Sequence, residues 1–445
     1  MFRLALPVVI VQLGTMTMGV VDAVMVGHVS APALAAVALG NVYFMAVAVF
    51  GMGTLMALDP VIAQAVGAGD VAGVARGIQR GLGIALLLTV PTSSLLVPGE
   101  WLLGLLQQPE EILPIASSYA RVSILGAFPF FAFIVLRQSL QALGHLSPIV
   151  VAIVGTNIAN VALNWLLVFG NLGFPRMGPI GSAWATAICR WLLAAGLLAL
   201  AWGELRPSLW PPRDRVLRAA PLLRMLRLGV PIGGAYQLEY SAFGAIALLM
   251  GWLGARELAA HHVALNLAAL TFMVPMGIAA AAAVRVGIAV GRQDAAAARR
   301  AAGVAALFAV AFMSLAAATF LLFPGPLARI FTEEDSVIAG AMVLIPIAGF
   351  FQVFDGLQVV GAGILRGLGD TRSPLVISVL GFWMIGFPVS LLLGFRMGMG
   401  GAGLWWGFVA ALGAVALALG IQAAVRLGRH MPRVAIDDDI PAAIP

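Results

Sequence analysis

The chain has 445 residues, of which 62% are hydrophobic and only 10% are charged, and its formal net charge is +6. Soluble domains carry about 25% charged residues, so the composition predicts an integral membrane protein with no room for a soluble domain. Every basic residue is arginine, which indicates compositional bias rather than a nucleic-acid-binding surface. The single cysteine, Cys189, excludes a disulfide framework and a cysteine metal cluster.

Apolar stretches long enough to cross a membrane follow one another along the chain. A spanning helix needs about 20 predominantly apolar residues, and twelve segments meet this requirement. They are 4–27, 36–58, 78–97, 116–138, 147–169, 179–203, 227–250, 258–282, 300–323, 340–362, 373–394 and 402–425. The first lacks the pattern of a cleavable signal peptide, so we expect it to be retained. The sequence therefore predicts an all-α membrane protein with twelve transmembrane helices.

The second half of the chain repeats the first. A shift of 224 residues aligns glycine, proline and aspartate positions, which match by chance less easily than alanine or leucine. The pairs include Pro7 with Pro231, Gly27 with Gly251, and Asp70 with Asp294. Six spans in each half make both halves enter the membrane from the same side, a parallel repeat that some transporters use. We predict an N-lobe at 1–205, a cytoplasmic linker at 206–226, a C-lobe at 227–425 and a cytoplasmic tail at 426–445.

Arginine is distributed unevenly between the two ends of the predicted spans. With a cytoplasmic N-terminus, nineteen of the 25 basic residues fall in cytoplasmic segments and four in external ones. Because positively charged loops stay on the cytoplasmic side, we expect both termini in the cytoplasm.

Three acidic residues, Asp22, Glu239 and Asp355, lie near the middle of predicted spans. A charged side chain at that depth costs at least a few kcal/mol and commonly marks an ion or substrate pathway. Each acid could instead be structural, held protonated or bonded to a neighbouring group. Three of them in one chain favour a functional site.

Polar residues in two neighbouring spans are candidates to surround Asp22. Asn160 and Asn164 are four residues apart and share a helix face, and Ser182 and Thr186 lie in the next span. The asparagines could join helices within the bilayer or supply donors and oxygens around Asp22. The sequence leaves both possibilities open.

Motifs of ATP-driven and catalytic proteins are missing from the sequence. It contains no Walker A motif, no HExxH and no CxxC. We therefore predict a protein that is not an enzyme, needs no cofactor and does not use ATP directly.

Several segments together resemble the MATE (multidrug and toxic compound extrusion) family, most of all its bacterial NorM-like branch. They are LALPVVIVQ at 4–12, MGVVDAVMVG at 18–27, GTLMALDPVIAQAVGAGD at 53–70, LGVPIGGAYQLEYSAFGAIALL at 228–249 and FDGLQVVGAGILRGLGDTRSP at 354–374. The resemblance covers essentially the whole chain. It implies two six-helix lobes and export of cationic, amphipathic compounds, driven by inward movement of Na⁺ or H⁺.

The resemblance also implies roles for individual residues. Asp22 matches the first-helix acid of the N-lobe, and Asn160 and Asn164 match its polar partners. Glu239 and Asp355 match the C-lobe acids of the NorM-like branch, which are expected to hold Na⁺ or a proton. The other residues expected to line the substrate or ion site are Ser182, Thr186, Tyr240 and Phe351, the last standing where some members have tyrosine.

These features predict a monomeric, cation-coupled antiporter of the bacterial inner membrane, with cationic small molecules as substrates. The alternative is a flippase for a lipid-linked saccharide or a related lipid, a function found among relatives of this fold. An arginine-lined cavity would favour the flippase, but only Arg190 lies clearly within a span. The third possibility, a transport-inactive sensor or scaffold, is disfavoured by the three acids.

Overall fold

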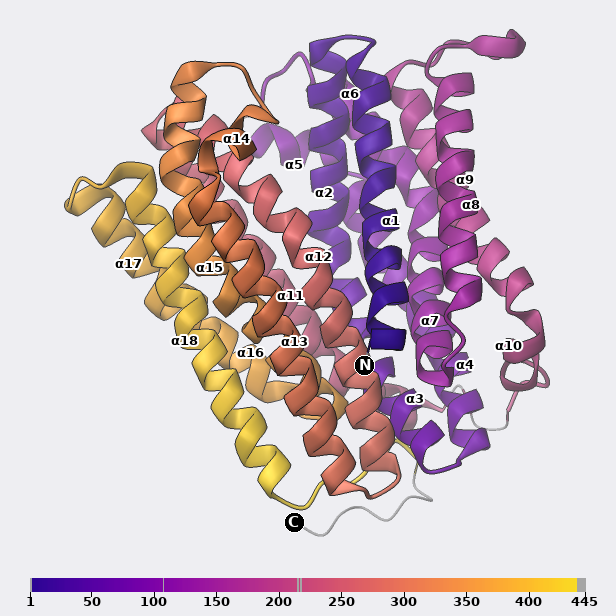
Figure 1. Ribbon diagram of the computed structural model, residues 1–445. Helices are drawn as coiled ribbons and strands as arrows, with labels where there is room; N and C mark the ends of the chain where they lie inside the picture. Colours follow the sequence, from indigo (N-terminus) through magenta and orange to yellow (C-terminus); the bar gives the residue numbers. More distant parts are fainter. Residues whose placement is uncertain (1, 107, 214–215, 217, 438–445) are drawn as a thin grey trace. The chain divides into compact units, whose positions relative to one another are not determined.

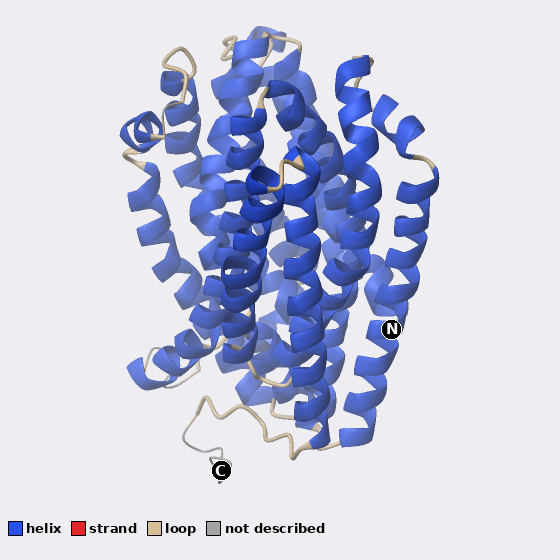
Figure 2. Cartoon of the chain, turned by 90° about the vertical axis from the view of Figure 1, so that its left-hand side faces the viewer, coloured by secondary structure: helices blue, strands red, loops and turns tan. Residues whose placement is uncertain are grey.

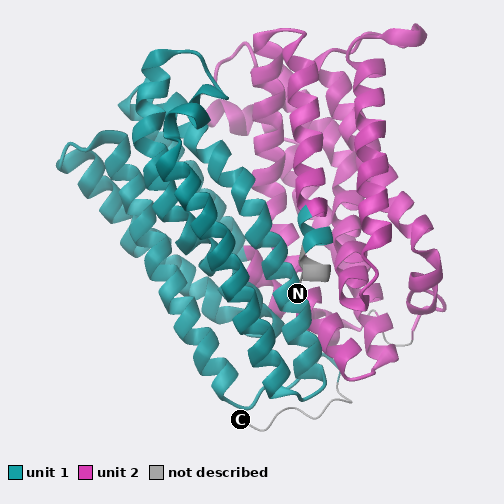
Figure 3. Ribbon diagram, viewed as in Figure 1, with its two compact units in different colours: residues 1–9, 234–445 teal, residues 10–233 magenta. Residues whose placement is uncertain are grey.

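The chain folds into helices joined by short loops, in a computed structural model that describes residues 2–106, 108–213, 216 and 218–437 (Figure 1). Across these residues no β-strand is present (Figure 2). The chain divides into two compact units (Figure 3): the N-unit, residues 10–233, and the C-unit, residues 1–9 and 234–445. Helices α1 (Phe2–Gly27) and α11 (Ala219–Leu253) each pass from one unit into the other.

The remaining helices of the N-unit follow one another with short connections. They are α2 (Ala31–Leu55), α3 (Leu58–Gly67), α4 (Val71–Leu96), α5 (Gly99–Leu105), α6 (Leu113–Ser123), α7 (Ala127–Leu143), α8 (Ser147–Leu167), α9 (Pro179–Leu200) and α10 (Trp202–Leu209). Two 3₁₀ turns, η1 (Ile124–Gly126) and η2 (Asn171–Gly173), accompany them. The turn η1 divides one membrane-spanning stretch into α6 and α7.

Long helices dominate the C-unit. They are α12 (Ala255–Gly291), α13 (Ala295–Leu322), α15 (Asp335–Gly367) and α18 (Gly400–Gly428), with the short α14 (Pro324–Arg329). The stretch 372–396 alternates between α- and π-helical geometry, as α16 (Arg372–Ser378), η3 (Val379–Gly386), α17 (Phe387–Leu391) and η4 (Leu392–Arg396). Pro388 lies inside this stretch, and its missing N–H cannot complete the regular α-helical ladder.

Eleven stretches of the described chain are long and apolar enough to cross a membrane. They coincide with eleven of the twelve predicted spans. The twelfth, predicted at 227–250, lies in α11, whose apolar sequence is interrupted by the polar residues of YQLEYS at 236–241. At 1.5 Å per residue, the 35 residues of α11 still exceed the roughly 30 Å of a bilayer core. The all-α membrane fold is confirmed. The predicted number of twelve transmembrane helices is reached only if α11 also spans the membrane.

One turn conformation recurs where four helices end. In each, a residue with positive φ is followed by a residue whose N–H donates to the carbonyl five positions earlier, as in a Schellman cap. The residues with positive φ are Gly69, Gly144, Gln293 and Gly369. After three of these turns an aspartate accepts a hydrogen bond from the first turn of the next helix: Asp70 accepts from Gly73 N–H, Asp294 from Ala297 N–H, and Asp370 from Ser373 N–H. The repeat seen in the sequence thus includes a shared cap, because Asp70 and Asp294 align in it.

Candidate ion and substrate site

Asp22 lies on α1 in the N-unit and is surrounded by hydrogen-bond donors. Its side chain is only 5% exposed. Oδ1 accepts hydrogen bonds from Nδ2 of Asn160 at 3.0 Å and of Asn164 at 2.7 Å. Oδ2 accepts one from Thr186 Oγ1 at 2.6 Å. Hydrogen bonds to a carboxylate favour its ionised form, so these three donors offset part of the cost of burying Asp22.

The helices that supply these donors are α8 and α9. One turn of α8 separates Asn160 from Asn164, and Nδ2 of Asn164 also donates to the Asn160 carbonyl at 2.9 Å. The sequence left open whether the asparagines join helices or surround Asp22. In the structure both donate hydrogen bonds to Asp22. Ser182 lies one turn before Thr186 on α9, and its buried Oγ has no hydrogen-bond partner in the described part of the chain.

Glu239 and Asp355 lie in the C-unit, on α11 and α15. Asp355 is 4% exposed and Glu239 is partly exposed. Glu239 is hydrogen-bonded to a residue of α15 that lies one turn from Asp355, which places the two acids in the same region of the C-unit. Gln358 Nε2 donates to Glu239 Oε2 at 3.2 Å, whereas no group within the described residues hydrogen-bonds to Asp355. The structure brings the two acids together and leaves them with few donors.

Phe351 and Tyr240 are the other residues expected at this site. Phe351 is 1% exposed and belongs to an aromatic cluster. Its ring centroid lies 5.7 Å from that of Trp405, 6.2 Å from that of Phe243 and 6.2 Å from that of Phe408. It therefore contributes packing and offers no oxygen. Tyr240 follows Glu239 on α11 and is half-buried; a lining role for either residue stays a prediction.

Two glutamines on α15 complete the surroundings of Asp355. Gln352 precedes it by three residues and Gln358 follows it by three, and both are buried. Gln352 Nε2 donates to Thr271 Oγ1 on α12. The Oε1 atoms of both glutamines are buried without a partner among the described residues. The sequence analysis missed both, although residues three apart on a helix are neighbours on its surface.

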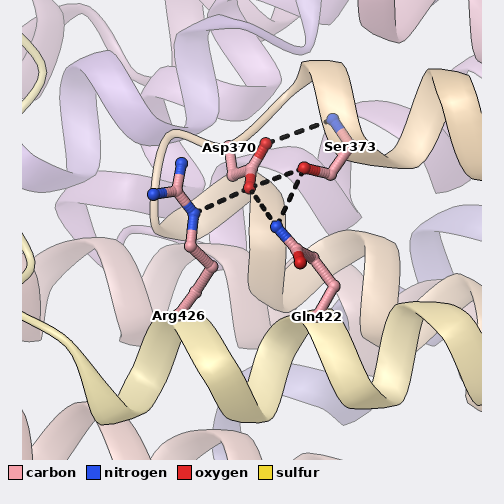
Figure 4. Close-up of polar contacts among 4 residues, drawn as sticks. All are labelled: Asp370, Ser373, Gln422 and Arg426. Carbon is pink, nitrogen blue, oxygen red and sulfur yellow. Dashed lines mark hydrogen bonds and ion pairs between the residues drawn. The ribbon is translucent and has the colours of Figure 1, made fainter.

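A further aspartate, Asp370, lies after α15, outside the membrane-spanning segments. Figure 4 shows its polar contacts. Its Oδ2 accepts hydrogen bonds from Arg426 Nε at 2.8 Å, Ser373 Oγ at 2.9 Å and Gln422 Nε2 at 3.1 Å. Burial opposes the ionised form of Asp370, but these donors outweigh burial and hold the pKa of its carboxyl below the usual 3.8. The cluster joins the turn after α15 to α18.

A family model described as MatE matches residues 7–166 and 231–392. The chain belongs to the MATE family. Members of this family are transport proteins, so the chain is a multi-pass membrane transporter. Two relatives illustrate the similarity. The probable multidrug resistance protein NorM of Mesorhizobium japonicum is 37% identical over 426 residues, covering 94% of this chain and 91% of the relative. The multidrug resistance protein PmpM of Pseudomonas aeruginosa is 36% identical over 442 residues, covering 95% and 90%.

Solved structures of MATE transporters share the fold. The eukaryotic MATE transporter AtDTX14 superimposes with a TM-score of 0.87 at 23% identity, over 97% of this chain and 98% of that one. A MATE protein in its bent conformation gives a TM-score of 0.85 at 20% identity, over 96% and 94%. At these identities the likeness shows the two-lobe fold alone.

Proposed function

We propose that this MATE transporter is a cation-coupled antiporter that exports cationic, amphipathic compounds by alternating access. Its relatives are named multidrug resistance proteins, which supports small toxic molecules as substrates. The observation that carries the coupling is the acid pair. Gln358, which lies one turn after Asp355 on α15, donates to Glu239 on α11, and it is the one donor seen to reach either acid among the described residues.

The pair of Glu239 and Asp355 supports antiport because ionising both carboxyls at once costs much free energy. In a low-dielectric region two neighbouring carboxyls titrate as a unit. A sodium ion, a proton or a cationic substrate can each compensate their charge. Competition for the same carboxylates then links inward movement of the ion to outward movement of the substrate. Each ligand favours the conformation that binds it more tightly.

A sodium ion would need more oxygen ligands than two carboxylates supply. Within the described residues no group of three or more His, Cys, Asp or Glu side chains could hold a metal ion. Hard cations prefer oxygen ligands, and the unpaired Oε1 atoms of Gln352 and Gln358 flank Asp355. These amide oxygens are therefore proposed as additional ligands.

Asp22 is proposed as a second polar site, which acts in coupling or binds substrate together with Asn160, Asn164 and Thr186. Ser182 is a proposed lining residue because its hydroxyl is buried and unpaired in the described structure. Tyr240 is another, because it adjoins Glu239.

The proposed location is the bacterial inner membrane, with both termini in the cytoplasm and the chain acting as a monomer. The arginine distribution supports this orientation. The lobes are proposed at 1–205 and 227–425, with the linker at 206–226 on the cytoplasmic side.

Export from proteoliposomes tests this function. The purified chain is reconstituted, and movement of ethidium is followed with a sodium gradient or a pH gradient imposed separately. We expect an inward gradient of one cation to drive ethidium against its own gradient, and dissipation of that gradient to stop it.

Two results would decide against the proposal. Ethidium movement that responds to neither gradient would exclude cation coupling. Translocation of a lipid-linked saccharide, with no ethidium movement, would favour the flippase.

A further inference from the structure

A guanidinium group lies half-way along a membrane-spanning helix of the N-unit without an ion-pair partner. Arg190 is the twelfth of the 22 residues in α9, which places it near the middle of a bilayer core of about 30 Å. Its Nη1 atom is buried and has no hydrogen-bond partner in the described structure. A cation at this depth is costly unless it is paired.

Aromatic rings hold the guanidinium in place. Its Cζ lies 3.8 Å from the ring centroid of Phe44 and 5.5 Å from that of Phe130. Phe44 is fully buried, so the stacked position is enclosed. Cation–π contacts are favourable, but a ring face gives the N–H groups of arginine no strong acceptor. The hydrogen-bonding edge of Arg190 therefore remains unused.

The guanidinium also lies against the helix break at η1. A Cβ on Gly126 would lie 2.8 Å from Arg190 Cδ and 3.2 Å from Nη1, so glycine permits this approach. The neighbouring Trp191 secures the break, because its Nε1 donates to the Leu125 carbonyl at 2.9 Å. Helix α7 begins directly after Gly126 without a side-chain cap.

Asp22 is a candidate ion-pair partner for Arg190, but the two side chains do not pair. Its hydrogen bonds come from Asn160, Asn164 and Thr186, and neither a hydrogen bond nor an ion pair joins it to Arg190 in the described part of the chain. Thr186 and Arg190 are four residues apart on α9 and share a face. Thr186 thus donates to Asp22, whereas the donors of Arg190, one turn later, have no acceptor among the described residues.

We propose that Arg190, beside Gly126, is an anion-binding subsite that takes the carboxylate of a zwitterionic, amphipathic substrate. This inference depends on the proposed function and adds to it a residue that recognises the carboxylate of a substrate. A planar guanidinium matches a carboxylate with two parallel hydrogen bonds. Its depth in α9 favours a substrate carboxylate over a lipid headgroup, since headgroups stay outside the hydrocarbon core.

The test uses two dyes that differ only in the carboxylate: tetramethylrhodamine and its methyl ester. Their binding to the full chain in nanodiscs of zwitterionic lipid is measured by fluorescence anisotropy. We expect Arg190→Gln to weaken binding of the free acid by about ten-fold or more, and binding of the ester by less than about two-fold. Arg190→Lys should lie between, because it keeps the charge and loses the planar fork.

The matched control is Arg121→Gln. Arg121 pairs with Glu100 at 3.5 Å and is 53% exposed, so this variant should change binding of neither dye. Thermal melting establishes that each variant is folded. If Arg190→Gln does not fold, the test relies on Arg190→Lys, which should weaken binding of the free acid more than binding of the ester.

Several results would overturn the subsite. They are failure of the wild type to bind the free acid, unchanged binding in both Arg190 variants, and equal weakening of both dyes. Displacement of the free acid by anionic lipid added to the nanodiscs would assign the subsite to lipid instead. Failure of the proposed function is separate, because it would appear as absence of gradient-driven ethidium export by the wild type.

Discussion

The two units surround their buried acids in opposite ways. Asp22 in the N-unit receives hydrogen bonds from three side chains. In the C-unit, Asp355 receives none from the described residues, and its neighbour Glu239 receives one from Gln358. Three donors offset part of the cost of burying a carboxylate, whereas two carboxyls short of donors need a proton or a cation. The N-unit thus supplies its acid with donors of its own, whereas the acids of the C-unit have few.

The internal repeat does not explain this difference, because the acids do not align in it. The 224-residue shift places Asp22 on Ile246 and Glu239 on Thr15. Ile246 is packed in the core of the C-unit, and Thr15 Oγ1 donates to the carbonyl of Gln12 on its own helix. The halves therefore share helices and turns, and each has acquired its own polar site.

The largest effect is expected for Asp355→Asn. The change removes the charge for which ion and substrate compete, so ion-driven ethidium export should fall to the level of empty liposomes. It breaks no hydrogen bond in the described structure, so the free energy of unfolding should change by less than about 1 kcal/mol. Full transport by this variant would contradict the proposed coupling site.

Asp22→Ala should instead damage the fold. It leaves the donors of Asn160, Asn164 and Thr186 buried without an acceptor, at an expected cost of about 3–5 kcal/mol. Asp355→Ala is the matched control and should cost less, since it strands no donor. Thermal unfolding in detergent measures the stability of both variants. Equal losses of stability would contradict the proposed difference in hydrogen bonding between the two units.

Thr186→Val tests one donor of the Asp22 site. It removes a single hydrogen bond to a charged group, worth about 1.5–3 kcal/mol. Ser182→Ala lies one turn away on α9 and removes a hydroxyl with no partner in the described region, so it should change stability by no more than about 0.5 kcal/mol. A larger loss for Ser182→Ala would mean that Ser182 has a partner of its own.

Among the acids, the smallest effect is expected at Asp370, which has donors but lies outside the spans. Asp370→Asn should cost about 1 kcal/mol at neutral pH, because Arg426 is 46% exposed and solvent weakens the pair. The pKa of Asp370 is lowered in the folded state, so its contribution is present above the unfolded value of 3.8. It is lost as the pH falls through the lower folded pKa.

The control for Asp370 is Asp294→Asn, which alters the same kind of helix cap. Asparagine caps helices about as well as aspartate, so stability should hardly change. Urea unfolding of both variants between pH 7 and about pH 3 makes the comparison. A loss at Asp370→Asn that persists at the lowest pH would contradict the ionic origin of its stability.

The sequence by itself determined the fold class, the positions of the spans and the presence of three unusual acids. Hydropathy and length suffice for the spans, because a helix in lipid must satisfy its backbone internally and present apolar side chains outward. The acids stand out for the same reason, since an ionisable residue in a span is rare. Helix α11 is the one predicted span with a weak apolar pattern, because its segment YQLEYS carries residues of the candidate site.

Only the tertiary structure decided which groups meet these acids. Asp22 and Thr186 are 164 residues apart, and Glu239 and Gln358 are 119 apart. Such pairings depend on how each helix is rotated about its axis, which local patterns in a nearly all-apolar span do not specify. For the same reason, the sequence placed Arg190 within a span but could not show that it stacks on Phe44 with an unused hydrogen-bonding edge.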